Sequence, residues 1–522
     1  MKVNKNKINY IIIFSMLTLF EQLQGVGLTI TKPGLYTLGD DLTIPPVAAD
    51  SIILIASSDV TLDLGGRIIS QSSITGGGNG ISIQTGLTNI TIKNGTIRNI
   101  TSNGIAVASG CKRITIENIV FQDFSASPIS LSSSCIDTVI SNCTFRTQAF
   151  TSSASSIITI GSTCSNLFVD GCSFKNLNVT VSLNVIDCSV ASTQNLVFTN
   201  LEFTTISGVN TNLFNLANSN AIYISNIVIE AANSTGAMNV INASTVSGLT
   251  VDDVTILKSS GGTTFSALNL SSVNGANVSN IVGASNTATT NFTFANMVNS
   301  NSINFSGLRE TNSTAGGVFS GVVLSNSSKN TFKNCVFNGN TGEDTFLGWD
   351  IISSSSYNYL TDCQLVQNTS VNTCRGFTVA GSASSFNTFD NCVATGLKST
   401  AVNTVGFQAQ STTAGTQCHM RYCLAYNNSA PGVCIGLGVD VAGVNWSVVE
   451  CNFFGNTGTT NSFGASFTGT SGIMTTKVLA FANGATAGNQ LSGVSSVTTP
   501  AAPASTNLNG VTAPWTNLAM AA

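Results

Sequence analysis

Apolar and polar residues alternate in a short phrase that recurs along most of the chain. The phrase is first clear at Ile90-Thr-Ile-Lys-Asn-Gly-Thr-Ile97, and we number its positions from the fifth residue, here Asn94. Across the copies, apolar residues stand four and two positions before this reference and one and three positions after it. Each half has the period of two that is typical of a β-strand, and the change of phase between the halves predicts a corner.

The spacing of the copies predicts the architecture. Fourteen copies follow one another at intervals of 24 to 31 residues, and all fourteen residues at position −2 are apolar. A period in this range indicates a solenoid with one continuous core. The leucine-rich phrase and the helix-forming second half of a leucine-rich repeat are lacking. We therefore predict an all-β fold, a single-stranded parallel β-helix of about fifteen coils that rise roughly 4.8 Å each.

The reference position itself predicts the corner. Two of its residues are Asp and two are Gly, and such residues tolerate the left-handed conformation that a sharp bend requires. Stacked amides can also hydrogen-bond from coil to coil, so we predict an internal ladder. Its members are the eight asparagines Asn94, Asn118, Asn142, Asn200, Asn226, Asn280, Asn334 and Asn391.

Three features together resemble a known family. They are the opening Lys32-Pro-Gly-Leu-Tyr36, the segment Asp59-Val-Thr-Leu-Asp-Leu-Gly-Gly66 and the coils with Asn at the corner. With these, about residues 28–480 resemble the right-handed parallel β-helix proteins of the pectin-lyase-like superfamily. The resemblance implies a right-handed helix. It implies no single function, because the superfamily includes polysaccharide lyases, glycosidases, phage tailspikes and adhesins.

The sequence divides into four segments. Residues 1–27 have a basic start, an apolar run and a small-residue site, which predict a cleaved secretory signal. Residues 28–58 are predicted as N-terminal cap strands, residues 59–482 as the β-helix, and residues 483–522 as a low-complexity tail or cap. We expect a protein that is secreted, periplasmic or attached to the cell surface, with no transmembrane span in the mature chain.

The composition limits the kinds of molecule that the protein is expected to bind. Charged residues are 8% of the chain, the net charge is −4, and no basic cluster follows the N-terminus, so nucleic acid is not an expected partner. Most of the fourteen cysteines share two columns, which favours buried free thiols over disulfides but leaves both open. The only histidine, His419, lies irregularly between Cys418 and Cys423, so we predict no metal and no cofactor.

Charged residues also share columns. Asp390 and Arg421 occupy position −1 of successive copies, which predicts an ion pair between neighbouring coils. Arg98, Arg146 and Lys175 recur at position +4 as a basic stripe. The stripe is open to two interpretations, a solvated surface or a receptor for an acidic glycan.

Motifs of the superfamily's enzymes are largely lacking. Of the four polygalacturonase motifs, Asn-Thr-Asp, Gly-Asp-Asp, Gly-His-Gly and Arg-Ile-Lys, only Gly39-Asp40-Asp41 occurs, in the predicted cap. Glycoside hydrolysis requires two carboxylates at a set separation, and acids are sparse here. The sequence therefore favours binding over catalysis and leaves both open.

One segment stands out as a candidate ligand site. Residues 342–359 combine the acids Glu343, Asp344 and Asp350 with the aromatic residues Trp349 and Tyr357. Aromatic faces beside hydrogen-bonding groups suit sugar rings. A loop packed over the sheet with an acidic rim explains the same residues. Further aromatic candidates are Tyr359, Tyr422, Tyr426 and Trp446.

The predicted function follows from abundant core pattern and sparse chemistry. We expect an exported β-helix with an adhesive, structural or glycan-binding role, whose partner is a polysaccharide or a cell-surface glycan. The alternative is a diverged polysaccharide lyase or glycoside hydrolase. Two acids and a base facing one groove on neighbouring coils would favour the alternative.

Overall fold

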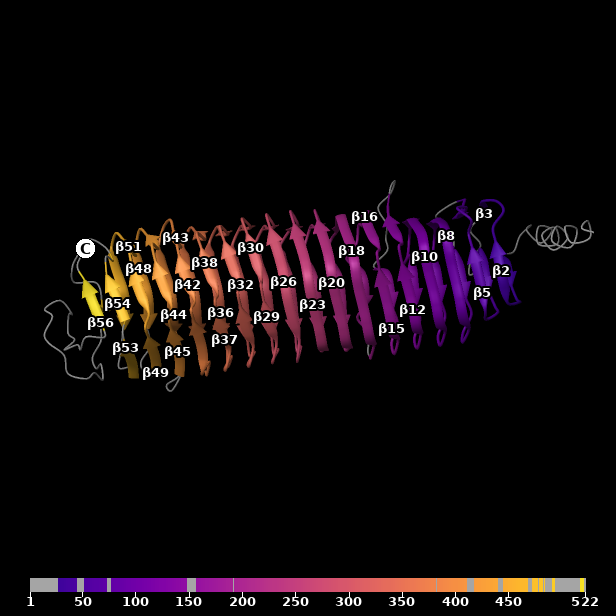
Figure 1. Ribbon diagram of the computed structural model, residues 1–522. Helices are drawn as coiled ribbons and strands as arrows, with labels where there is room; N and C mark the ends of the chain where they lie inside the picture. Colours follow the sequence, from indigo (N-terminus) through magenta and orange to yellow (C-terminus); the bar gives the residue numbers. More distant parts are fainter. Residues whose placement is uncertain are drawn as a thin grey trace, which may run out of the picture. The chain divides into compact units, whose positions relative to one another are not determined.

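Parallel strands from successive turns lie side by side throughout the described part of the protein (Figure 1). In the described ranges every regular element is a β-strand, and the recorded strand pairs are parallel. The fold is the predicted right-handed parallel β-solenoid, of about 15 turns. The computed structural model describes residues 27–44, 51–72, 77–147, 156–190, 192–381, 383–410, 417–439, 445–467, 472–476, 478–481, 483, 491–492 and 517–520.

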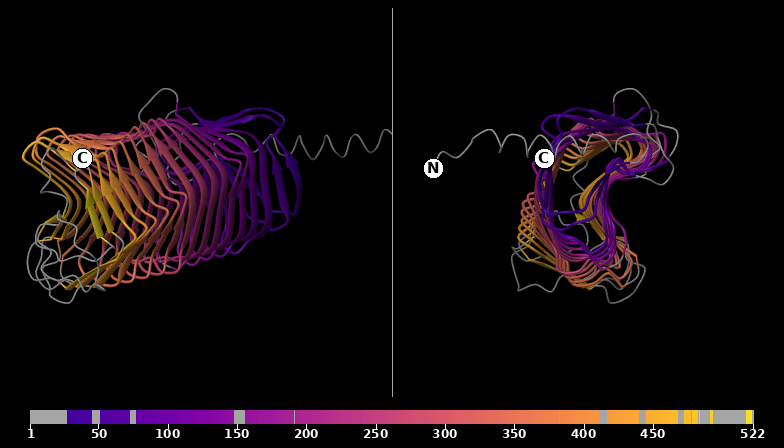
Figure 2. Two further views of the ribbon diagram at one scale, coloured as in Figure 1. Left: turned by 60° about the vertical axis from the view of Figure 1, so that its left-hand side comes forward. Right: turned by 90° about the vertical axis from the view of Figure 1, so that its right-hand side faces the viewer.

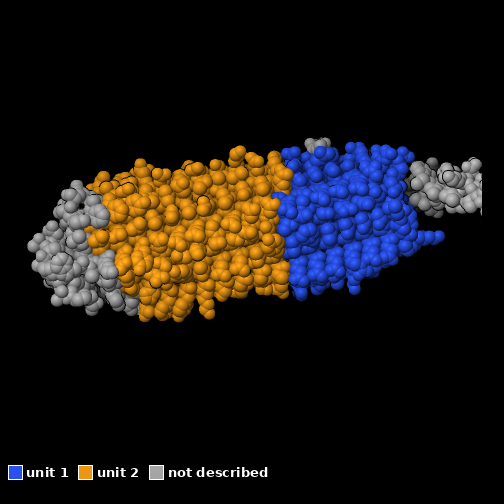
Figure 3. All heavy atoms as spheres, viewed as in Figure 1, with its two compact units in different colours: residues 1–201 blue, residues 202–522 orange. Residues whose placement is uncertain are grey.

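The chain forms two compact units, residues 1–201 and residues 202–522, which are coloured separately in Figure 3. Each unit contains strands of two sheets, which we call sheet A and sheet B. In unit 1, sheet A holds β1 (Leu28–Ile30), β4 (Ile53–Ile55), β7 (Ile81–Ile83), β9 (Ile105–Val107), β11 (Ile129–Leu131), β14 (Ser156–Ile160) and β17 (Leu183–Cys188). Sheet B of the same unit includes β2 (Gly34–Thr37), β3 (Leu42–Ile44), β5 (Val60–Asp63), β6 (Ile68–Gln71), β8 (Thr88–Ile100), β10 (Lys112–Phe124), β12 (Ile136–Ser141), β13 (Thr144–Arg146), β15 (Ser165–Asp170) and β16 (Ser173–Asn178).

Unit 2 repeats one arrangement from turn to turn. Sheet A here holds β19 (Thr211–Ala217), β22 (Met238–Ser244), β25 (Thr264–Ser271), β28 (Asn291–Val298), β32 (Val318–Ser325), β36 (Thr345–Ile352), β40 (Thr373–Ala380), β44 (Asn403–Gln410), β48 (Val433–Val439), β52 (Asn461–Phe467) and β55 (Leu491–Ser492). In one turn, three short strands of sheet B precede β36, namely β33 (Thr331–Lys333), β34 (Val336–Asn338) and β35 (Thr341–Gly342). Each pairs in parallel with its counterpart in the next turn, β37 (Tyr359–Thr361), β38 (Gln364–Val366) and β39 (Thr369–Ser370).

Stacked apolar side chains fill the interior. The residues at position −2 are buried, which confirms the core column read from the sequence. In unit 1 the rings of Phe121, Phe145 and Phe174 stack on successive turns, with centroids 5.0 and 4.8 Å apart. Removing a side chain of this size from water stabilises the fold by about 1.5–3 kcal/mol.

Sheet A strands of unit 2 depart from the regular alternation of inward-facing and outward-facing residues. In β36, Gly348 and Trp349 are adjacent and both buried, while Leu347 and Asp350 on either side are half-exposed. A regular strand would turn adjacent side chains to opposite faces, so the strand bends at this pair. Figure 2 shows that the wall of the turns bends inward on one side.

The corner prediction is confirmed in its backbone and wrong in its location. All eight asparagines of the predicted ladder have positive φ angles, between 52° and 60°. Some of their amides do bond to the preceding turn, as Asn118 Nδ2 does to Asn94 Oδ1 at 3.3 Å. However, the eight side chains are exposed or half-exposed. The left-handed corner directs them outward, because the strands on both sides fill the interior with apolar groups.

Internal asparagine ladders occur at other positions in unit 2. Asn340 Nδ2 donates to the Glu310 carbonyl at 3.0 Å, and its Oδ1 accepts from the Ser313 amide at 3.0 Å. Its own amide donates to Asn368 Oδ1 at 2.9 Å, so the side chains link successive turns. Each net bond contributes about 1 kcal/mol, and leaving a buried partner unsatisfied costs more. The buried asparagines are Asn286, Asn330, Asn340, Asn358, Asn368, Asn387, Asn428, Asn456 and Asn483.

In the described part of unit 2, one carboxyl group lies inside the solenoid. Glu310 in β30 (Arg309–Thr311) is fully buried, and its Oε1 accepts from Asn286 Nδ2 at 3.1 Å and from the Ser313 hydroxyl. Burial raises the pKa of Glu310 to about 8, against an ordinary value of 4.5. Gly283 lies in register one turn earlier, where a Cβ would be 1.7 Å from Glu310 Oε2. Gly283 thus provides the space that the carboxyl group occupies.

All fourteen cysteines are buried free thiols, which is the alternative that the sequence favours. At position +1 of unit 2 the thiol of Cys392 donates to the carbonyl of Leu360, one turn earlier, at 3.6 Å. Burial raises the pKa of Cys392 well above its ordinary value. These thiols behave as small apolar groups with weak hydrogen bonds.

The structure describes the predicted N-terminal cap but little of the predicted signal and tail. In the predicted cap, β1, β2 and β3 pair in parallel with β4, β5 and β6, as the strands of any other turn do. Residues 1–26 of the predicted signal and most of the tail at 483–522 lie outside the described residues. Among those described, no helix has the length and apolar character needed to cross a membrane.

Candidate functional site

The five predicted ligand residues lie in three different places. Glu343 and Asp344 precede β36, Trp349 and Asp350 lie within it, and Tyr357 follows it. β36 has eight residues, so about 25 Å of strand separates its two ends at roughly 3.3 Å per residue. The structure does not bring these residues together as one site.

Trp349 cannot serve as a ligand platform, and this part of the prediction is wrong. Its side chain is fully buried, stacked on Phe377 at 4.9 Å and in edge contact with Phe337 at 5.0 Å. Trp446 is buried as well and lies 6.2 Å from Phe389. Both rings belong to the core.

Glu343 and Asp344 form part of an exposed turn between β35 and β36. The Asp344 side chain accepts from Asn372 Nδ2 in the next turn, and the Asn372 amide donates to the Asp344 carbonyl at 2.9 Å. These contacts join neighbouring turns. They give Asp344 a structural explanation without a ligand.

Asp350 lies on the outer face of sheet A beside a base. Burial raises its pKa, and the Arg375 guanidinium on β40 lowers it in part. Thr378 and Gln408 are in register with Asp350 on the next two strands, and they are 1% and 6% exposed although they belong to the outer face. This face is therefore recessed. It brings together one acid and one base, not the two acids that hydrolysis requires.

Tyr357 forms an exposed aromatic pair on the side of sheet B. It stacks on Phe386 of the next turn, with ring centroids 4.8 Å apart and planes inclined by 10°. The two side chains are 57% and 38% exposed. Because both residues precede a sheet B strand with positive φ, the backbone turns their rings outward. Two large exposed rings in parallel form an apolar platform.

A polar network begins two residues beyond this pair. Tyr359 donates its hydroxyl hydrogen to Asp390 Oδ2 at 2.7 Å, and Arg421 Nη2 donates to the same oxygen at 2.8 Å. The ion pair confirms the stacking of Asp390 and Arg421 that the sequence predicts. Hydrogen bonds from Arg421 to Asp390 and to the Tyr359 oxygen raise the pKa of Arg421.

Two further side chains continue the surface. His419 is exposed on β45 (Gln417–Arg421), in register with Thr388, which in turn is in register with Tyr359. Tyr422 follows at the corner and is 51% exposed. We call the group of Tyr357, Phe386, Tyr359, Asp390, Arg421 and Tyr422 the aromatic band.

The chemistry of the aromatic band suits binding. Flat rings bury the apolar face of a sugar, while phenol and guanidinium groups contact its hydroxyls. The Asp390 carboxylate is held by two donors of the protein. In the described ranges, no three or more His, Cys, Asp or Glu residues are placed to hold a metal ion.

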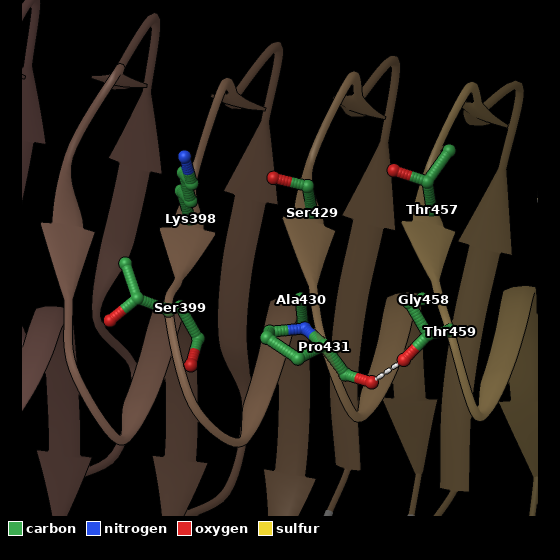
Figure 4. Close-up of a pocket in the computed structure, with 9 residues that line it drawn as sticks. Lys398, Ser399, Ser429, Ala430, Pro431, Thr457, Gly458 and Thr459 are labelled. Carbon is green, nitrogen blue, oxygen red and sulfur yellow. Dashed lines mark hydrogen bonds between the residues drawn. The ribbon is translucent and has the colours of Figure 1, made fainter.

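A shallow hollow of about 460 Å³ lies on three successive turns of unit 2 (Figure 4). Lys398 contributes its one charged group, and Ser429 and Thr457 occupy equivalent strands beside it. Pro431 accepts a hydrogen bond from the Thr459 hydroxyl across its floor. The lining is otherwise small and neutral, so the hollow offers a ligand little chemistry.

Sequence reasoning missed Phe386 and the role of Tyr359. Both had a detectable signal. Tyr357 and Phe386 share position −5 of successive copies, so stacking between turns follows from the repeat register. Tyr426, another predicted aromatic, likewise stacks on Phe454 at 5.0 Å.

Comparisons with known proteins agree with the fold. Residues 40–186 match the family described as "Right handed beta helix region". No curated protein sequence matches the chain.

Two solved structures are similar to the chain at low identity. The surface protein and adhesin PfbA of Streptococcus pneumoniae shares 13% identity, with 68% of this chain and 91% of that chain covered and a TM-score of 0.22. The A-module of the mannuronan C-5 epimerase AlgE6 of Azotobacter vinelandii shares 11% identity, with 93% of each chain covered and a TM-score of 0.21. Neither similarity bears on the activity of this chain.

Proposed function

We propose that this protein is an exported β-helix that binds a glycan at the aromatic band. The exposed stack of Tyr357 on Phe386 is the observation that supports the proposal. Export is proposed from the basic and apolar pattern of residues 1–27.

The band differs from the rest of the outer surface. Outward positions of the solenoid are mostly Ser, Thr and Asn, which leave a sheet face neutral and polar. Exposing two large rings there costs free energy that a bound sugar face would recover, at about 25 cal/mol per Å² of buried apolar surface. The network of Tyr359, Asp390 and Arg421 holds polar groups in a fixed position beside the rings.

A binding screen with matched variants tests this proposal. Neutral and acidic polysaccharides are tested by affinity electrophoresis and by calorimetry, and released reducing or unsaturated ends are measured in parallel. For a polysaccharide that binds, Tyr357→Ala with Phe386→Ala should weaken binding by more than about 1 kcal/mol. Tyr223→Ala is the control, since Tyr223 is 40% exposed on β20 (Asn220–Glu230) of the same sheet. Undiminished binding in the double variant, with an unchanged circular dichroism spectrum, would exclude the band.

A second candidate function is a polysaccharide-acting enzyme centred on Asp350. The observation in its favour is an acid of raised pKa beside a base on a recessed face. The measurement of released ends separates the two functions. Turnover that disappears in Asp350→Asn and persists in the double aromatic variant would favour the enzyme.

A further inference from the structure

Basic residues stack on the outer face of sheet B in unit 1. Arg98, Gln122, Arg146 and Lys175 occupy position +4 of four successive turns and are in register with one another. Arg98, Arg146 and Lys175 are the basic stripe, and the neutral Gln122 lies between the two arginines. All four side chains are half-buried, so they lie against the sheet instead of extending into solvent.

The stripe places like charges close together. Neighbouring strands are about 4.8 Å apart, so Arg146 and Lys175 are separated by one such step and Arg98 and Arg146 by two. Like charges stacked across strands destabilise a sheet. The whole chain has only 19 basic residues, which makes their alignment here costly and unusual. Sites that break a local stability rule in this way are often functional.

The arginines also have unused donors. The Nε atoms of Arg98 and Arg146 are buried and have no hydrogen-bond partner in the described part of the chain. Arg146 Nη2 donates to Gln122 Oε1 at 3.2 Å, and Gln122 Nε2 donates to Asp123 Oδ2 at 2.9 Å. Asp123 is itself 4% exposed, so its carboxylate offers little to a ligand or to the arginines. The buried Nε atoms are out of a ligand's reach, so a ligand would contact the outer nitrogens of the two half-buried guanidinium groups.

We propose that the basic stripe binds an anionic polysaccharide whose carboxylate or sulfate groups pair with Arg98 and Arg146. A guanidinium presents parallel N–H donors that match such oxyanions in a bidentate geometry. The row of cations spans several turns, so a polymer with charges along its length fits it better than a single small anion does. Three cations are few for nucleic acid, whose binding proteins typically neutralise many phosphates.

This site goes beyond the proposed glycan binding at the aromatic band. It lies in the other unit, and its chemistry is ionic where the band's is apolar. Binding at the stripe should therefore weaken with added salt, because mobile ions screen exposed charges. Binding at the aromatic band should depend little on salt. The two proposals can fail separately.

Binding of three defined polymers to the full chain tests the proposal. The polymers are polygalacturonate, which carries carboxylates, dextran sulfate, which carries sulfates, and unmodified dextran. Arg98→Gln with Arg146→Gln removes both guanidinium groups and introduces the residue type that Gln122 already provides in the same column. We expect at least one anionic polymer to bind in low salt, and the double variant to weaken that binding at least ten-fold.

Controls separate the stripe from general charge. Lys333→Gln with Lys398→Gln removes two exposed cations from unit 2 and should leave the affinity within two-fold. Arg98→Lys with Arg146→Lys keeps the charge but loses the bidentate geometry, so it should weaken binding less than the glutamine variant does, and it serves as the test when the glutamine variant folds poorly. The proposal is overturned if neither anionic polymer binds, if the control loses as much affinity as the stripe variant, or if double-stranded DNA binds more tightly than both polysaccharides.

Discussion

Replacing Glu310 by Gln should stabilise the protein at neutral pH and change little in acid. Gln has nearly the same shape and never ionises, so it removes only the cost of the charged form. In the folded protein burial raises the pKa of Glu310 to about 8, whereas in the unfolded chain it is near 4.5. Below pH 4.5 both states hold the proton, and stability is at its maximum with respect to this group.

Stability then decreases as the pH rises. Between the two pKa values the unfolded chain releases its proton and the folded protein retains it, so each pH unit favours unfolding by about 1.4 kcal/mol. The accumulated loss is about 3 kcal/mol at pH 7, and it reaches a plateau above pH 8. Glu310→Gln should remove this dependence and keep both hydrogen bonds, because Asn286 and Ser313 donate to the same oxygen, Oε1, which glutamine retains.

Urea unfolding at pH 4.5, 7 and 8.5 measures the effect. The difference in unfolding free energy between Glu310→Gln and the natural protein should grow by about 3 kcal/mol from pH 4.5 to pH 7. Glu343→Gln is the control, because Glu343 is exposed in the same unit and should leave the pH profile unchanged. A constant difference between Glu310→Gln and the natural protein at all three pH values would refute the assignment of a raised pKa to Glu310.

Three further predictions follow from the interior of the solenoid. Gly283→Ala should destabilise unit 2 by about 1–3 kcal/mol through overpacking against Glu310, and combining it with Glu310→Ala should restore part of the melting temperature. Asn340→Ala should lower the free energy of unfolding by about 1–3 kcal/mol, because it leaves buried hydrogen bonds unmade. Asn334→Gly, at the exposed corner of the same turn, should be nearly neutral in the same thermal melts, and equal losses of stability in the two variants would contradict this prediction. A thiol reagent should label almost no cysteine in the native protein and about fourteen after denaturation without reductant; fewer after denaturation would indicate disulfides.

Periodicity alone could predict the core and the corners. An apolar residue recurs at position −2 in every copy, and together with the corner residues that column predicts coils around one continuous core. Internal ladders could not be read in the same way. Asn330, Asn358 and Asn387 stand at position −4, which the phrase as a whole marks as apolar, and their burial depends on amide bonds between turns.

The candidate site was predictable only in part. Trp349 was expected at the surface because aromatic residues near acids resemble a sugar site, but the bend at Gly348 and Trp349 makes two adjacent residues face the interior, and the Trp349 ring enters the core. Strand alternation from the sequence cannot reveal such a bend. Tyr357 is exposed as expected, and its partner Phe386 becomes apparent only when successive copies are aligned.

The spacing of the turns in unit 2 also bears on how such a protein can change in length. Along sheet A the amides of Asn242, Asn269 and Asn296 each donate to the asparagine 27 residues earlier, at 2.8–3.0 Å. A duplication or deletion of one such 27-residue unit would leave every later residue in register with the same repeat position on the neighbouring turn. Any shorter insertion or deletion would shift the apolar core residues out of register with those of the neighbouring turns. Genes for chains of this kind can therefore gain or lose whole turns by recombination between neighbouring repeats and still encode a continuous interior.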